Sequence, residues 1–307
     1  MTFACGHLPF APAVEAVLAE ARVRVDRSEW ELHAGGSAHI VVNAGHVMSV
    51  RIAKNPTSGE NVRRRTRALS RLPEFDFAVP RPLTPVLQDG RYTAVGMTWI
   101  PGSPRPPGHA DPRELRRVLE QVHDADARAA EPWLDRPGQH WGGHRRRHVL
   151  LDQVLPLLLP RNRDRAMNAI EDLVALDNVP PRLVHGDLMG SNMLWQDDHL
   201  VGVIDWDHAS MSDPAYDVAS LGLWFGWSSV RQATDEENYL RARLHSRIFP
   251  LQAVAYALHH ELDTAQIRQA VEKADAWYET RPWPPCERHA MSEALPTLIG
   301  CPSVPPP

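Results

Sequence analysis

The chain has 307 residues, of which 43% are hydrophobic and 23% charged, values typical of a globular protein with ample material for a core. The formal net charge is −5, and no apolar run approaches the roughly 18 residues that cross a bilayer, so we expect neither nucleic acid nor a membrane as partner. Three scattered cysteines and an N-terminus without a signal-peptide pattern predict a cytoplasmic protein.

The first hundred residues predict a β-rich region. Short apolar runs separated by Gly, Asn and Asp are typical of strands joined by turns. The predicted elements are, in chain order, a helix over residues 11–25, three strands between 30 and 54, a helix over 59–72, and strands over 77–87 and 91–100. We therefore predict an N-terminal β-rich nucleotide-binding lobe over residues 1–100.

Residues 101–112 are rich in Pro and Gly and predict a linker. The chain then becomes mainly helical. The predicted elements are helices over 111–127, 145–159, 163–177 and much of 215–279, with a strand over 182–185 and a hairpin over 192–204. We predict a helical catalytic and substrate lobe over residues 113–285 and a Pro-rich tail over 286–307. The expected fold class is α+β.

The predicted hairpin carries polar residues at its ends. An apolar strand ends in His185 and Asp187, Asn192 opens the next strand, and Asp205 follows the last one. Since the start of one antiparallel strand faces the end of its partner, Asn192 and Asp205 should come together beside Asp187. Carboxylate and amide oxygens suit Mg²⁺. A further carboxylate, Asp187, would accept the proton of a hydroxyl, so the pattern predicts phosphoryl transfer.

Three motifs occur in order here: HGDLMGSN from His185, IDWD from Ile204 and DPAYD from Asp213. They resemble the aminoglycoside phosphotransferase and choline kinase family, whose fold is similar to that of protein kinases. The resemblance implies a two-lobe, protein-kinase-like fold that uses Mg²⁺ and ATP or GTP. The sequence pattern HGDLxGxNxLW followed by DWD also resembles that of the phosphotransferases that inactivate viomycin and capreomycin.

The resemblance also implies roles for individual residues. The implied roles are catalytic base for Asp187 with His185 beside it, metal ligands for Asn192 and Asp205, and supporting residues for Asp207 and Asp217. Asp217 would brace the catalytic loop through His185.

The N-terminal region resembles the family less closely. The turn Gly35-Gly36-Ser37 is a candidate for covering phosphates with its N–H groups, and a plain hairpin turn is the alternative. The resemblance implies that the adenine ring of the nucleotide bonds to backbone groups near Thr98 and Ile100.

One departure concerns the cation that binds phosphate. Arg51 stands where the family has a lysine, with Lys54 as the alternative cation. Arginine can bind phosphate bidentately. On the next helix, Arg65 or a neighbouring residue falls where the family has a glutamate, and Glu60 is the only acid near that helix start. The orientation of Arg51 therefore has no explanation in the sequence.

The expected function is phosphorylation of an antibiotic hydroxyl, giving resistance. The acceptor would be an aminoglycoside, a related cationic peptide such as viomycin or capreomycin, or a macrolide. Residues 197–279 contain fourteen acids and six bases, which would attract a cationic acceptor. The alternatives are a metabolic kinase for choline, a sugar or an amino-acid derivative, and a pseudokinase that only binds. A metallohydrolase lacks histidine ligands at suitable spacing.

Overall fold

The computed structural model describes residues 8–33, 39–53, 55–90, 92–108 and 110–281. They form an α+β protein with two compact units, each discontinuous in sequence. The first unit comprises the described residues within Met1–Pro107, Glu120–Leu134 and His185–Ala209, and the second those within Gly108–Leu119, Asp135–Val184 and Ser210–Pro307. The hairpin that carries Asn192 and Asp205 thus belongs to the same unit as the N-terminal strands. The predicted lobe boundaries stay a prediction.

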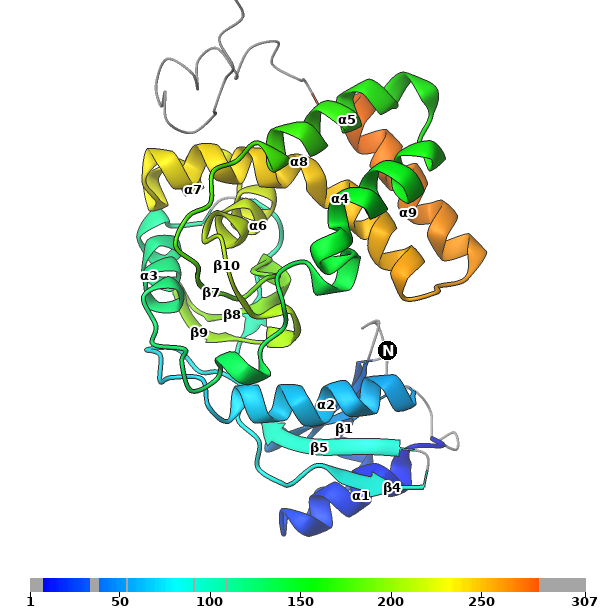
Figure 1. The fold of residues 1–307 in the computed structure, drawn as a ribbon. Coiled ribbons are helices and arrows are strands. Elements are labelled where there is room, and N and C mark those ends of the chain that lie inside the picture. The colour runs from blue at the N-terminus through cyan, green and yellow to red at the C-terminus, as the bar shows by residue number, and fades with distance from the viewer. Residues whose placement is uncertain (1–7, 34–38, 54, 91, 109, 282–307) are drawn as a thin grey trace, which may run out of the picture. The chain divides into compact units, whose positions relative to one another are not determined.

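The first unit is built on a five-stranded antiparallel sheet with strand order β1-β2-β3-β5-β4 (Figure 1). Its strands are β1 (Trp30–His33), β2 (His39–Ala44), β3 (Met48–Ala53), β4 (Leu87–Asp89) and β5 (Tyr92–Thr98). The flanking helices are α1 (Ala11–Glu20) and α2 (Pro56–Leu69), and Figure 1 shows them on opposite faces of the sheet.

The alternation of side chains along β3 explains this layering. Met48, Val50 and Ile52 are fully buried and share a core with Val14 and Val17 of α1. Because successive side chains on a strand point to opposite faces, the intervening residues face the α2 side. Arg51 is one of them.

A second, three-stranded sheet with order β6-β8-β9 completes the first unit. Its strands are β6 (Ser103–Pro104), β8 (Met193–Gln196) and β9 (His199–Val203). Met193 pairs with Val203, and the amide of Ile204 donates to the carbonyl of Asn192 at 2.9 Å. The predicted hairpin over 192–204 is therefore confirmed.

The second unit is mainly helical. Its helices are α4 (Arg146–His148), α5 (Pro160–Val174), α6 (Ala215–Phe225), α7 (Trp227–Ala233), α8 (Glu236–His259) and α9 (Thr264–Thr280), while α3 (Pro112–His123) is divided between the units. A two-stranded sheet pairs β7 (Arg182–Val184) with β10 (Ser210–Ser212). The helices bury a core that includes Leu158, Ile170, Leu251 and Tyr278.

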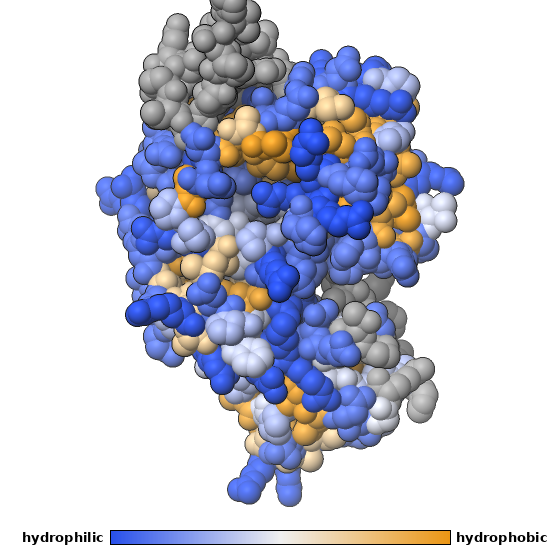
Figure 2. Space-filling model, in the orientation of Figure 1, coloured by the Kyte–Doolittle hydropathy of each residue, from blue (hydrophilic) through white to orange (hydrophobic). Residues whose placement is uncertain are grey.

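The surface in Figure 2 is largely hydrophilic, with hydrophobic patches in the region where Figure 1 draws α5 and α8. Exposed apolar side chains of the second unit include Leu157, Leu159 and Val174. Within the described part of the chain, we find no helix long and apolar enough to span a bilayer.

Two predicted elements were wrong. The strand predicted over 77–87 is absent apart from Leu87 in β4, because Pro80, Pro82 and Pro85 have no N–H to donate to a ladder. The helix predicted over 145–159 breaks after α4 into a π-helix over Val149–Val154 and a 3-10 turn over Leu155–Leu157. Pro156 cannot continue an α-helical hydrogen-bond ladder.

Candidate active site

His185 directly follows β7 and is completely buried. Its Nε2 lies 2.9 Å from the carbonyl oxygen of Ile204, and its Nδ1 lies 3.2 Å from the backbone nitrogen of Asp187. Since a carbonyl only accepts and an amide only donates, the proton of the imidazole sits on Nε2. The ring therefore ties the backbone of Asp187 to the end of the β8–β9 hairpin.

Gly186 allows this tight turn. Its backbone has φ of +80°, and a Cβ at this position would lie 2.3 Å from the carbonyl oxygen of His208. Both the conformation and the space exclude a side chain. The glycine thus lets the segment before Asp187 pack directly against the residues that follow Asp205.

Asn192 is buried and holds Asp187 through two hydrogen bonds. Its Nδ2 donates to the main-chain oxygen of Asp187 at 2.8 Å and to Oδ2 of the same residue at 3.0 Å. The amide nitrogen is thereby committed, so the side-chain oxygen of Asn192 is the atom left to act as a ligand.

Asp205 occupies a left-handed backbone conformation, with φ of 62° and ψ of 56°. Such a conformation costs a non-glycine residue on the order of 1 kcal/mol or more and often marks functional sites. Its side chain is 49% exposed. The surrounding protein atoms and the nearby charge of Asp207 raise the pKa of Asp205 above its usual value. A bound cation would favour its ionised form.

Trp206 anchors the segment between Asp205 and Asp207. Its indole is buried, its Nε1 donates to the carbonyl of Val203 at 2.9 Å, and its ring stacks on Phe75. Because Trp206 begins a 3-10 turn after the left-handed Asp205, the two carboxylates are held by one fixed stretch of backbone.

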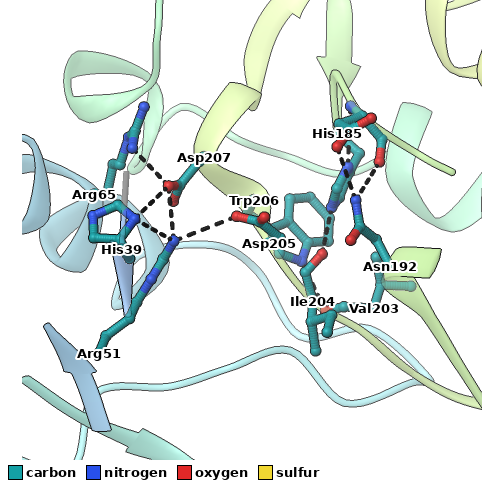
Figure 3. A network of polar contacts seen from close by, with 11 residues as sticks. His39, Arg51, Arg65, His185, Asn192, Val203, Ile204, Asp205, Trp206 and Asp207 are labelled. Carbon is teal, nitrogen blue, oxygen red and sulfur yellow. Dashed lines mark hydrogen bonds and ion pairs between the residues drawn. The ribbon is translucent and has the colours of Figure 1, made fainter. Parts of the chain in front are cut away.

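Asp207 is the centre of a buried ionic cluster (Figure 3). Its Oδ2 accepts hydrogen bonds from Arg51 Nη2 at 2.7 Å and from Arg65 Nη1 at 2.6 Å. His39 Nδ1 lies 3.4 Å from the same oxygen. Arg51 Nη2 also reaches Asp205 Oδ1 at 3.3 Å, so Arg51 bridges both acids of the IDWD motif.

The charges of this cluster support one another. Burial would raise the pKa of Asp207, but Arg51, Arg65 and His39 hold it below the usual value. Burial likewise opposes the charge on Arg51, and Asp207 and Asp205 outweigh that effect and raise the pKa of Arg51. The pairing therefore favours the charged forms of both Asp207 and Arg51.

Within the first unit, Asn192 contacts Asp187, and Arg51 contacts both Asp205 and Asp207; the backbone bond from Ile204 to Asn192 links the two groups. Thr98 lies at the end of β5, where its Oγ1 accepts from the amide of Arg81 at 2.9 Å. Ile100 is buried against Gly202. The roles expected for Thr98 and Ile100 in binding adenine stay predictions.

Asp217 is completely buried in the first turn of α6 in the second unit. Its predicted link to His185 stays a prediction. Four predicted nucleotide-binding residues lie outside the described residues: Gly35, Gly36, Ser37 and Lys54.

The sequence did not predict that His39 and Arg65 contact Asp207. A signal was present for Arg65, because an acid was expected at this position or at a neighbouring one. Asp207 was also predicted as a supporting residue without a named partner. His39 carried no signal, since the polar face of a strand routinely presents such residues to solvent.

Residues 30–282 match the phosphotransferase enzyme family. Over 215 residues the chain is 26% identical to the viomycin phosphotransferase of Streptomyces vinaceus, which covers 64% of this chain and 73% of that protein.

The fold is also shared with solved structures. The GDP complex of aminoglycoside 2'-phosphotransferase-IIIa has a TM-score of 0.72 at 17% identity, covering 89% of this chain and 99% of that one. The macrolide 2'-phosphotransferase from Brachybacterium faecium has a TM-score of 0.65 at 21% identity, covering 89% and 99%. These likenesses confirm the predicted kinase-like α+β fold. Because the family match spans most of the sequence, the chain belongs to the phosphotransferase enzyme family and is a transferase of the kinase type.

Proposed function

We propose that this protein transfers the γ-phosphoryl group of ATP or GTP to a hydroxyl group of an antibiotic. The observation that carries the proposal is the placement of Asp187, Asn192 and Asp205 around one hairpin, with Arg51 in contact with Asp205. Phosphoryl transfer needs metal ligands, a carboxylate that accepts a proton and a cation for the phosphates. This arrangement offers candidates for each.

Asn192 and Asp205 are the residues that would hold Mg²⁺. The donor set fits this metal, because the amide nitrogen of Asn192 is committed to Asp187 and the side chain of Asp205 is 49% exposed. Mg²⁺ prefers hard oxygen ligands and takes the rest of its shell from water and substrate phosphates. When bound, it would neutralise charge on the β- and γ-phosphates.

Asp187 is the proposed catalytic base. The acceptor hydroxyl attacks the γ-phosphorus, a new O–P bond forms, and the bond to the β-phosphate oxygen breaks to release ADP or GDP. Asp187 takes the hydroxyl proton. His185 acts through Asp187, because it accepts the N–H of that residue and holds the loop in place.

The names of related proteins support an antibiotic as acceptor. They include a viomycin phosphotransferase and phosphotransferases of aminoglycosides and macrolides. The acid surplus of residues 197–279 favours a cationic compound. Asp207, Asp217 and Asp275 are buried, so they contribute less to this surface charge. A cationic peptide of the viomycin and capreomycin type or an aminoglycoside therefore fits best, and phosphorylation would confer resistance.

The test is a transfer assay with the purified full chain, Mg²⁺, and ATP or GTP. The acceptors are viomycin, capreomycin, kanamycin, gentamicin and a macrolide, with choline and amino alcohols as metabolite controls. Mass spectrometry detects the phosphorylated product. A susceptible bacterium expressing the wild type should tolerate the compound that is modified, and one expressing Asp187→Asn should not.

The outcomes separate the proposal from its alternatives. Phosphorylation of a metabolite control but of no antibiotic would identify a metabolic kinase. Nucleotide binding without turnover on any acceptor would indicate a pseudokinase. Either result overturns the proposed function.

A further inference from the structure

Arg51 stands in a strand position where a phosphate-binding cation needs a partner to hold it. The neighbouring helix α2 has no acid at Arg65 or its neighbours, where one is expected. Glu60, the acid near the helix start, is exposed. Two arginines on adjacent elements would repel each other in the absence of an intervening anion.

Asp207 supplies that anion. Its Oδ2 accepts from Arg51 at 2.7 Å and from Arg65 at 2.6 Å. The side chains are only 16% exposed for Arg51, 9% for Asp207 and 8% for Arg65. Charge-assisted hydrogen bonds at these distances are among the stronger ones in proteins, and burial protects them from solvent screening.

We propose that Asp207 positions Arg51 for the nucleotide phosphates, and that Arg65 holds Asp207 from α2. The Arg51–Asp207–Arg65 bridge would then replace the acid missing from the helix. This inference rests on the proposed function. Asp207 and Arg65 are positioning residues, since only Arg51 would touch the nucleotide.

The donors of Arg51 divide in a way that suits this role. Nη2 donates to Asp205 Oδ1 at 3.3 Å and to Asp207 Oδ2 at 2.7 Å, and it lies 3.2 Å from His39 Nδ1. Nη1 and Nε make no hydrogen bond to any described residue. Nη1 and Nε can therefore donate to phosphate oxygens while Nη2 stays bonded to Asp207.

The bridge also gives a useful balance of charge. Two guanidinium groups against one carboxylate leave one positive charge in excess. A simple pair of one cation and one acid would be neutral. Once Asp205 serves the metal, its charge no longer offsets this excess. The bridge then presents a net positive group to the anionic nucleotide.

The longer contact between Arg51 and Asp205 makes Asp207 the essential partner. On binding Mg²⁺, Asp205 would move away from Arg51. Asp207 is not a proposed metal ligand, so its contact with Arg51 would remain. Losing Asp207 should therefore leave Arg51 without its acid in the nucleotide-bound protein, and also leave two buried arginines facing each other.

The first test compares Asp207→Asn, Asp207→Glu and wild type. Calorimetry measures the Kd for Mg·ATP and for Mg·GTP without any acceptor, and circular dichroism measures Tm. We expect Asp207→Asn to weaken binding of the preferred nucleotide about tenfold or more, equivalent to about 1.4 kcal/mol. Asp207→Glu should recover much of the affinity, because it keeps the carboxylate.

The second test moves the acid to the helix. Arg65→Glu alone places two acids around Arg51, and Asp207→Asn alone leaves two arginines. The double variant Asp207→Asn/Arg65→Glu restores one acid beside Arg51, so it should bind nucleotide more tightly than either single variant. Arg63→Glu is the matched control, since Arg63 is exposed on the same helix and should change the Kd by no more than about twofold.

Kinetics distinguish positioning from general loss of structure. In the transfer assay, Asp207→Asn should raise the KM for nucleotide more than it lowers kcat. An unchanged nucleotide Kd in a folded Asp207→Asn protein would contradict the proposed bridge. A double variant that binds nucleotide no more tightly than either single variant would contradict it too. Those results leave the phosphotransferase proposal standing, whereas a wild type that binds neither nucleotide refutes both.

Discussion

Asn192 donates its side-chain amide to both the main-chain oxygen and the Oδ2 of Asp187, at 2.8 and 3.0 Å. This pairing fixes the carboxylate of the proposed base relative to Asn192, a proposed metal ligand at the end of the 3-10 turn just before β8. It also explains why an amide rather than an acid stands at position 192. A carboxylate there would repel Asp187 instead of donating to it.

Replacing Asn192 by Asp tests this relationship. The new carboxylate should raise the pKa of Asp187 through repulsion between like charges, so the acid limb of the kcat–pH profile should move to higher pH. With the orienting bond lost as well, we expect kcat at neutral pH to fall about tenfold to a hundredfold. A kcat profile superimposable on that of the wild type would show that the bond does not orient the base.

Asp187→Asn should abolish most turnover and leave the fold intact. General bases contribute about 10²- to 10⁴-fold to rate, so kcat should fall by that range, with Tm and nucleotide Kd near the wild-type values. Asp198→Asn is the control, because Asp198 lies in the turn after β8 with its side chain 98% exposed. Equal activity in Asp187→Asn and Asp198→Asn would remove Asp187 from the mechanism.

Gly186→Ala should destabilise the first unit strongly. The added Cβ would lie 2.3 Å from a backbone oxygen, and φ is +80°, so both a clash and backbone strain result. We expect a loss of about 2 kcal/mol or more in the free energy of unfolding, measured by urea titration. Gly90→Ala shares a positive φ of +54° but meets nothing within 4 Å, and should cost only about 1 kcal/mol. Equal losses would mean that the close approach to His208 contributes nothing.

The stability of the protein in acid should depend on Asp213. Burial opposes ionisation of Asp213, but hydrogen bonds from His245 at 2.9 Å and from Arg241 outweigh it and hold the pKa below its usual value. A lowered folded-state pKa means that the unfolded chain binds the proton first as pH falls. The stabilisation from Asp213 is therefore complete above about pH 5 and is lost as pH drops through and below about 4.

Asp213→Asn should remove that contribution. Its unfolding free energy should vary less between pH 5 and 3 than that of the wild type, by up to about 1.4 kcal/mol per pH unit. Asp177→Asn serves as control, because Asp177 meets Arg241 through its backbone oxygen, which the substitution retains. Identical slopes for Asp213→Asn and wild type would contradict the assignment.

Local patterns predicted much of the fold. The three strands between residues 30 and 54 and the hairpin over 192–204 follow from short-range apolar periodicity, and both were confirmed. The strand over 77–87 failed because an apolar run with three prolines satisfies the hydrophobic pattern but not the hydrogen bonding. The apolar pattern by itself did not show that the backbone could not form the hydrogen bonds of a strand.

The sequence by itself determined that Asn192 would lie opposite the end of the strand before Asp205, because antiparallel pairing across a short turn depends on neighbouring residues only. Tertiary structure decided what surrounds Arg51. Asp207 lies 156 residues from Arg51 and 142 from Arg65 in the chain, and no periodicity links them. Only the packing of α2 against the sheet, with the turn at Trp206 held in place, brings two arginines onto one carboxylate. Such a contact depends on the shape of the whole unit, which no local pattern encodes.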